Sequence, residues 1–237
     1  MTIRKRFSAN FNLTRRHLLK GASACAALAL APHNTQAQPA PVPLDAYQCS
    51  FFNAEEWAFV MAAAERLIPA QGNGPGALET RVPVYIDKQL ATPWGQGEHW
   101  YRQAPFNRDA PRYTGYQAAP SPAEAYRIAI PRINQWCQDR YGAIFADLAP
   151  EQQDDALAQI EKDNVPIDEI RSGDFFSFLL ANTKEGYFSD PLHGGNYKMA
   201  SWVYIGFPGA RASFLEWVDR DNVRYPLGPV SFLGERA

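Results

Sequence analysis

The sequence predicts an all-α fold: a single compact helical domain with long, irregular, aromatic-rich loops, behind a cleavable N-terminal signal. Apolar residues recur at helical spacing in several segments, and helix-start signals such as Ser-Pro-Ala-Glu at 121–124 stand directly before them. No segment keeps the period-two alternation of a half-buried strand. The expected parts are a signal at 1–37, an extended arm at 38–50, a helical domain at 51–215 and a C-terminal tail at 216–237.

The N-terminal segment has the pattern of an export signal. A twin arginine, Arg15 and Arg16, stands ahead of a run of small apolar residues at 22–31, and six basic residues and no acidic one precede this run. Small residues at 35 and 37 suit cleavage, and the run is too short for the roughly 20 residues that span a bilayer as a helix. An amphipathic surface helix, the alternative, would have polar residues within the run. The pattern predicts export by the twin-arginine machinery and removal of residues 1–37.

Cofactor motifs are absent from the rest of the sequence. Proteins exported by this route are generally folded, often with a cofactor, before they cross the membrane. The chain nevertheless lacks the Cys-x-x-Cys-His of haem attachment and a Gly-x-Gly-x-x-Gly after a strand. Its glycine-rich stretch at 72–76 follows a predicted helix and is expected to form a turn. We therefore expect no cofactor-binding residue in this chain, and a signal that also serves a partner.

The charge of the mature chain argues against two classes of partner. The whole sequence has 23 basic and 25 acidic side chains, and residues 1–37 hold six of the basic ones and none of the acidic ones. The mature chain therefore has 17 basic and 25 acidic side chains, a net charge of −8. Nucleic acid and anionic membrane surfaces repel such a chain. Because no later apolar run is long enough to insert, we expect membrane attachment only through another subunit.

Two cysteines, Cys49 and Cys137, remain after removal of the signal. An oxidising compartment would allow a disulfide between them, and a loop of about 90 residues gives about 4–5 kcal/mol in the chain-entropy model. Two buried free thiols, or a bridge from one cysteine to a partner, are the alternatives. No Cys or His lies at ligand spacing from either cysteine, so we expect no metal site.

Helices are expected in order along the domain. Asn53 and Glu56 form a capping-box pattern that starts a helix ending before Pro69, and Pro83 opens a shorter helix that continues through Leu90. A loop with three prolines follows at 103–120, and loops of that length often contact a partner.

The second half of the domain has three further helix signals. Ser-Pro-Ala-Glu at 121–124 starts a helix to about Arg140, and Pro131 within it is expected to kink or interrupt it. A helix is expected at 150–162, and a strongly apolar one begins at Asp174.

A group of short motifs lies between Glu185 and Arg211. They are Gly-Tyr-Phe at 186–188, Asp-Pro at 190–191, Gly-Gly-Asn at 194–196, Trp202 and Ile-Gly-Phe-Pro-Gly at 205–209, with support from Arg-Leu-Ile-Pro at 66–69 and Tyr-Ile-Asp at 85–87. This pattern resembles the signature of the gluconate 2-dehydrogenase subunit 3 family, and the resemblance covers roughly residues 50–215.

This resemblance implies a complex of three chains. A large subunit holds FAD and oxidises D-gluconate to 2-dehydro-D-gluconate, and a multihaem cytochrome c subunit accepts the electrons and anchors the complex on the periplasmic side of the membrane. The small chain escorts the flavin subunit through export and stabilises it, and is not itself catalytic. Related complexes act on fructose, sorbitol or glucose, and nothing in this sequence selects among them.

The same block contains six aromatic residues between positions 187 and 207. Either they pack across the helices or they form anchors of an interface, where aromatic residues are enriched. The candidate interface residues are Tyr187, Phe188, Asp190, Asn196, Trp202 and Phe207.

Single polar residues give weak evidence for catalysis. His193 could act as a base with Asp190 as its orienting group, but an aspartate before proline more often caps a turn. Adjacent acidic residues, Glu55–Glu56 and Asp154–Asp155, point in different directions on a helix, and Arg66 suits a salt bridge. An independent periplasmic enzyme and a chaperone that releases its client remain the rival interpretations.

Overall fold

A computed structural model describes residues 41–237 of the chain. The chain divides into two units, 1–43 and 44–237, and the second unit is described here. The predicted signal with Arg15 and Arg16 lies outside the described residues. Six α-helices and no strand occur in the described part, which confirms the all-α class there. The helices are α2 (Ala54–Leu67), α3 (Val82–Leu90), α4 (Pro122–Tyr141), α5 (Pro150–Glu161), α6 (Ser172–Phe188) and α7 (Ala200–Ile205).

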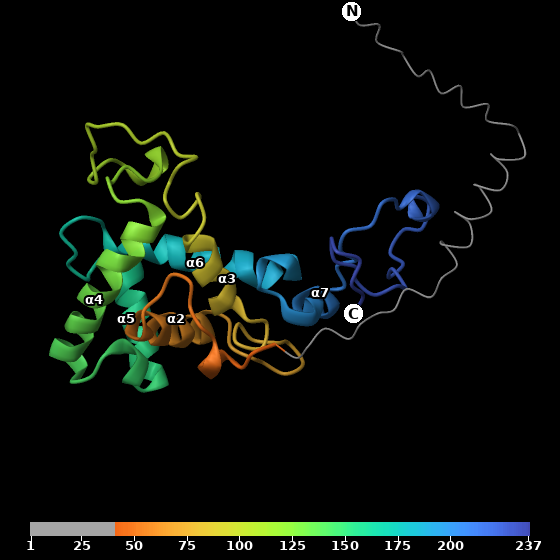
Figure 1. Ribbon diagram of the computed structural model, residues 1–237, viewed down its shortest axis with the longest axis horizontal. Helices are drawn as coiled ribbons and strands as arrows, with labels where there is room; N and C mark the ends of the chain where they lie inside the picture. The colour runs from red at the N-terminus through yellow and green to blue at the C-terminus, as the bar shows by residue number, and fades with distance from the viewer. Residues whose placement is uncertain (1–40) are drawn as a thin grey trace, which may run out of the picture. The chain divides into compact units, whose positions relative to one another are not determined.

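Helix α6 is the centre of the packing, because it contacts all five other α-helices (Figure 1). Its buried aromatic residues join those of α2, α4 and the turn after α4. The Phe175 ring lies 5.2 Å from that of Tyr126 and 6.1 Å from that of Phe59, which in turn contacts Phe145 at 4.7 Å. The Asn182 amide donates to the Tyr126 hydroxyl at 3.1 Å, so the one polar atom of this buried ring is satisfied.

Both predicted capping boxes are confirmed. In α2, Glu56 N–H donates to the Asn53 side chain while the Asn53 N–H donates to the Glu56 carboxylate, each at 2.9 Å. Ser121 and Glu124 form the same reciprocal pair at the start of α4. These pairs satisfy N–H groups that a helix start otherwise leaves unbonded.

Helix α4 is continuous through Pro131, so the helix is not interrupted there, and a kink at Pro131 stays a prediction. Pro131 is exposed, so water can satisfy the carbonyl that lacks a helical partner. Helix α6 begins at Ser172, two residues before the predicted Asp174, and the Asp163 carboxylate accepts a hydrogen bond from Gly173 N–H at 3.0 Å.

A buried carboxylate holds the segment that enters the domain. Asp87 of α3 is fully buried and accepts four hydrogen bonds, two on each oxygen. The donors are the Tyr47 hydroxyl at 3.0 Å and the backbone N–H groups of Ser50, Phe51 and Phe52 at 2.7, 2.9 and 3.0 Å. The predicted arm includes one 3-10 turn, Leu44–Ala46, and Asp87 fixes the end of this arm on the helical body.

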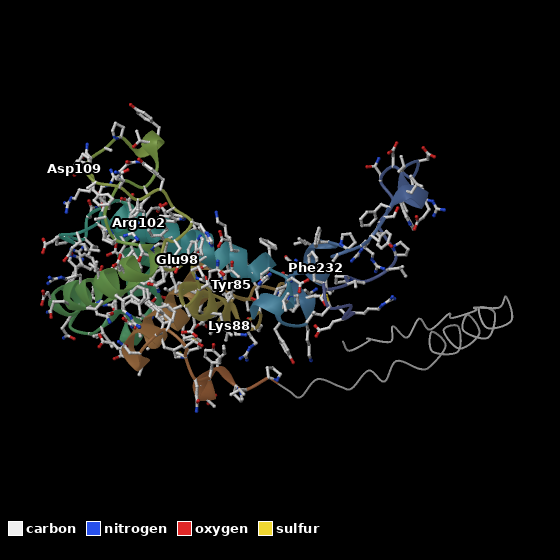
Figure 2. All side chains as sticks on the ribbon, turned by 45° about the horizontal axis from the view of Figure 1, so that its top comes forward. Tyr85, Lys88, Glu98, Arg102, Asp109 and Phe232 are labelled. Atoms are coloured by element: carbon white, nitrogen blue, oxygen red, sulfur yellow. The ribbon has the colours of Figure 1, made fainter. Side chains whose placement is uncertain are left out.

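The loop at 103–120 is fastened to the N-terminal half of α6. Tyr116 packs on Phe178 with ring centroids 4.9 Å apart, and Trp100 contacts both rings. Arg102, labelled with Asp109 in Figure 2, donates to the Ala119 carbonyl and pairs with Glu124 at 3.3 Å. Partner binding by this loop stays a prediction.

Cys49 and Cys137 are free thiols in the structure, and a disulfide between them stays a prediction. Cys49 lies in the segment held by Asp87 of α3, whereas Cys137 is fully buried on α4. Burial raises the pKa of Cys137 to about 12, and burial with the nearby Asp87 carboxylate raises the pKa of Cys49 to about 11. Both groups are therefore protonated and weakly nucleophilic at neutral pH.

Candidate functional site

The residues from 185 to 211, here called the signature block, run from the last turn of α6 through α7 to the turn that follows it. Two 3-10 turns, Pro191–His193 and Tyr197–Met199, lie between these helices. Helix α7 contacts α6 and the second of these turns, and lies beyond the end of α6, away from α4 and α5 (Figure 1).

Asn196 is the central polar residue of the signature block. It is fully buried, its amide donates to the Ser189 carbonyl at 2.9 Å, and its oxygen accepts from Ser201 N–H at 3.0 Å. The Ser201 hydroxyl lies 2.7 Å from the same Asn196 oxygen and 2.5 Å from the Tyr187 carbonyl, to one of which it donates. One side chain thus joins the end of α6, the connecting turns and the start of α7.

Close contact between two backbone segments requires glycine at position 195 of this block. A Cβ on Gly195 would lie 2.2 Å from the Gly186 carbonyl oxygen, inside van der Waals contact. The adjoining backbone is strained, because Asn196, Lys198 and Met199 all have positive φ, at 44°, 55° and 55°. Such residues cost about 1–3 kcal/mol each and gather where surrounding contacts enforce an unusual geometry.

The Asp190 carboxylate caps a turn and does not bond the His193 side chain. Its Oδ1 accepts from Leu192 N–H at 3.0 Å and its Oδ2 accepts from Phe232 N–H at 2.7 Å. His193 is exposed on the same turn. The two side chains therefore form no hydrogen-bonded acid–base pair in the described part of the chain, which agrees with the capping interpretation of Asp190.

The other weighed polar residues also have structural partners. Arg66 binds both carboxylate oxygens of Asp154, at 2.8 and 2.6 Å, and so ties α2 to α5. Asp155 accepts instead from the Tyr141 hydroxyl at 2.5 Å. Glu55 accepts from Asn134 and Glu56 binds Arg127, so neither adjacent pair of carboxylates acts as one site.

Helix α7 exposes an unbroken apolar run. Only Ser201 and Trp202 of this helix are buried, and Val203, Tyr204 and Ile205 are 46%, 57% and 54% exposed. Phe207 follows them at 45%. We call Val203, Tyr204, Ile205 and Phe207 the α7 platform. Contiguous exposed apolar residues of this kind mark interaction sites.

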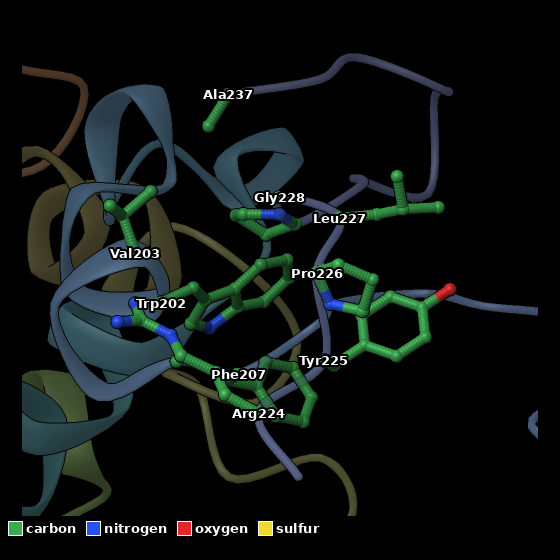
Figure 3. A pocket seen from close by; sticks show the side chains of 11 residues that line it. Trp202, Val203, Phe207, Arg224, Tyr225, Pro226, Leu227, Gly228 and Ala237 are labelled. Carbon is green, nitrogen blue, oxygen red and sulfur yellow. The ribbon is translucent and has the colours of Figure 1, made fainter. Parts of the chain in front are cut away.

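Trp202 and Phe207 stand between two clefts. Their rings meet edge to face with centroids 5.1 Å apart, and the Trp202 indole donates to the Phe188 carbonyl at 2.8 Å. On one side they face Tyr225 and Pro226 across a cleft of about 340 Å³ (Figure 3). On the other side they line a cleft of about 860 Å³ that Phe232 also borders.

The segment 212–237, here called the C-terminal segment, supplies further exposed apolar side chains. Ala210 N–H donates to the Val230 carbonyl at 2.7 Å, and this contact, with the Asp190 bond, ties the segment to the signature block. Exposure ranges from 39% to 80% in Phe214, Leu215, Val218, Val223, Leu227, Phe232 and Leu233.

The six candidate interface residues fall into two groups. Tyr187, Asp190, Asn196 and Trp202 are at most 8% exposed and shape the block from inside. Phe188 and Phe207 are 44% and 45% exposed and are available to a partner. Tyr204 was among the six aromatic residues weighed as interface anchors, but the sequence did not indicate Val203 and Ile205 of α7 or the exposed residues of the C-terminal segment. The sequence feature that could have indicated them is the high proportion of apolar residues in segments that show neither helical nor strand periodicity.

Burial shifts the pKa of three groups beside the block. It raises the pKa of the Tyr187 phenol, whose hydroxyl donates to the Pro75 carbonyl at 2.8 Å. Burial, followed by the Glu185 charge, raises the pKa of Tyr85 to about 12, and burial also raises the pKa of Glu185. These are consequences of desolvation rather than of a catalytic pair.

Within residues 41–237, no group of three or more His, Cys, Asp or Glu side chains is placed to hold a metal ion. None of the helices in the same range is long and apolar enough to cross a membrane.

Comparison with known proteins identifies the family of the chain. Neither the curated proteins nor the solved structures give a match. The family model described as gluconate 2-dehydrogenase subunit 3 matches residues 54–209, which run from the start of α2 to the end of the Ile-Gly-Phe-Pro-Gly turn. This match spans more than half of the sequence, and the chain belongs to the gluconate 2-dehydrogenase subunit 3 family.

Proposed function

We propose that the chain is the small, or gamma, subunit of a periplasmic gluconate 2-dehydrogenase that is membrane-associated through its partner subunits. In this proposal the partner chains are an FAD-binding large subunit, which converts D-gluconate to 2-dehydro-D-gluconate, and a cytochrome c subunit. The small subunit contributes no reacting group. It binds the folded flavin subunit, shares its twin-arginine signal with it during export, and remains bound to stabilise it.

The observation that carries this proposal is the α7 platform. Three consecutive helix residues and Phe207 are about half exposed, although Trp202 beside them is buried and hydrogen-bonded. A rigid support beneath an exposed apolar surface suits a stable interface better than a transient contact. The C-terminal segment adds apolar area of the same kind.

Export and assembly are tested together by changing the signal. The chain is expressed with its flavin subunit, as the wild type and as an Arg15→Lys, Arg16→Lys variant, and flavin absorbance and dye-linked gluconate oxidation are measured in periplasm and cytoplasm. We expect a stoichiometric flavoprotein in the periplasm with the wild type and in the cytoplasm with the variant. A colourless small chain with no companion in either fraction would refute the proposal. Fructose, sorbitol and glucose are assayed in parallel to identify the substrate.

A further inference from the structure

The larger cleft beside the α7 platform has a fixed shape. It is lined by Asp190 and His193 of the first 3-10 turn, by Trp202 and Phe207, and by Phe232 of the C-terminal segment. Hydrogen bonds hold these parts together, because Phe232 N–H binds Asp190 at 2.7 Å and Ala210 N–H binds the Val230 carbonyl at 2.7 Å. A preformed cleft binds a partner without an ordering cost.

Gly209 allows the signature block and the C-terminal segment, which together form this cleft, to come into backbone contact. It has a φ of 72°, and a Cβ at this position would lie 2.2 Å from the Val230 carbonyl oxygen. Any larger residue would separate the signature block from the C-terminal segment. The cleft therefore depends on this glycine of the signature.

Arg211 lines this cleft, and its guanidinium contacts Tyr225 and Gly228, which line the smaller cleft. Its guanidinium lies over the Tyr225 ring, 5.2 Å from the centroid, and one terminal nitrogen donates to the Gly228 carbonyl. Its Nε is buried without a hydrogen-bond partner, and no carboxylate pairs with it in the part of the chain that the structure describes. Arg102 also has a buried, unbonded Nε, but it pairs with Glu124.

We infer that this cleft binds a segment of the flavin subunit that inserts an apolar side chain between Trp202 and Phe232 and places a carboxylate on Arg211. The inference rests on the proposed function. A planar guanidinium matches a carboxylate, and the surrounding rings exclude water and so strengthen the pair. A second copy of this chain fits less well, because two mature chains of net charge −8 repel each other.

The experiment measures binding of the flavin subunit to purified small-subunit variants that carry an affinity tag. Arg211→Gln removes the charge, and Phe232→Ser removes the apolar wall. The matched controls are Arg220→Gln and Tyr101→Ser, because Arg220 stacks on Trp217 at 4.6 Å outside the cleft and Tyr101 is 91% exposed outside the signature block and the C-terminal segment. We expect each cleft variant to weaken binding by about ten-fold or more and each control by less than about two-fold.

Salt dependence separates loss of the ion pair from loss of the fold. Raising NaCl from about 0.05 to about 0.5 M is expected to weaken wild-type binding, and Arg211→Gln is expected to remove most of this dependence while keeping its melting temperature. If the wild type binds the flavin subunit and Arg211→Gln binds it equally well, the cleft inference is wrong and the proposed function stands. If the wild type binds no flavoprotein, the proposed function fails. A homodimer that Arg211→Gln abolishes would overturn the assigned occupant.

Discussion

Asp190 and Phe232, 42 residues apart, are joined by a hydrogen bond of 2.7 Å from the Phe232 backbone N–H to the Asp190 carboxylate. The other carboxylate oxygen caps the turn that begins at Pro191. One signature residue therefore shapes its own turn and also positions the C-terminal segment. The family signature here acts mainly as internal structure, and the surface that it supports is apolar.

Replacing Asp190 with Ala is expected to release the C-terminal segment. The variant loses a turn cap and the bond to Phe232, which we expect to lower the free energy of unfolding by about 1–2 kcal/mol. Hydrogen exchange should become faster at residues 229–234. Asp221→Ala, at an exposed position of the same segment, is the control. Unchanged exchange at 229–234 in Asp190→Ala would show that the bond does not hold the segment.

Backbone strain at Lys198 predicts a stabilising substitution. Lys198 has a φ of 55° and is exposed. Lys198→Gly removes the steric cost of this positive φ, and we expect this gain to exceed the conformational entropy that glycine loses on folding. We expect the free energy of unfolding to rise by up to about 1 kcal/mol, despite loss of the contact of Lys198 Nζ with the Tyr197 ring.

The matched control for this substitution is Lys184→Gly, at an exposed position inside α6. There glycine is expected to lower the free energy of unfolding by about 1 kcal/mol. Urea unfolding measures both. Equal losses in the two variants would mean that the positive φ at Lys198 is not enforced in the protein.

The Asp87 carboxylate should be indispensable as an acceptor. Asp87→Asn replaces one acceptor oxygen with an NH2 donor, so two of the four buried donors lose their partner. We expect a loss of at least about 2 kcal/mol in the free energy of unfolding. Asp45→Asn, on the exposed turn of the arm, should have little effect. Equal stability of the two variants in urea would contradict a clamp at Asp87.

Several parts of this fold could be predicted from local chemistry. The capping boxes at Asn53 and Ser121 depend on side chains within four residues of each other, and both form as the sequence predicts. The path of the C-terminal segment depends on Asp190 meeting a backbone N–H 42 residues later, which no local pattern indicates. The exposed run of α7 was also not predicted, because Trp202 and Tyr204 have the same apolar character and differ only in what packs against them.

Alkaline pH is expected to destabilise the folded chain. The pKa of Cys49 is raised from 9.0 to about 11, mainly by burial and then by Asp87, and that of Tyr85 is raised from 10.0 to about 12. At a pH between the ordinary pKa and the raised pKa of each group, the group has lost its proton in the unfolded chain and keeps it in the folded chain. The free energy of unfolding therefore falls as pH rises through this window.

Urea unfolding at about pH 8 and about pH 10 measures this effect. A Cys49→Ser variant, which has no thiol to ionise there, should lose less stability over the same interval than the wild type. An equal loss would mean that the Cys49 thiol does not contribute, and a gain in stability at about pH 10 would reverse the assigned direction of the shifts.

The most direct test of the central claim is photo-crosslinking in intact cells that express the chain with its flavin subunit. A photoreactive phenylalanine analogue replaces Tyr204 on the α7 platform or, as the control, Lys162 at the C-terminal end of α5, which lies away from α7 (Figure 1). Both positions are exposed, so random encounters reach both. The account predicts an adduct with the flavin subunit from position 204 and little or none from position 162. Adducts from position 162 alone, or equal adducts from both, would contradict an interface on α7.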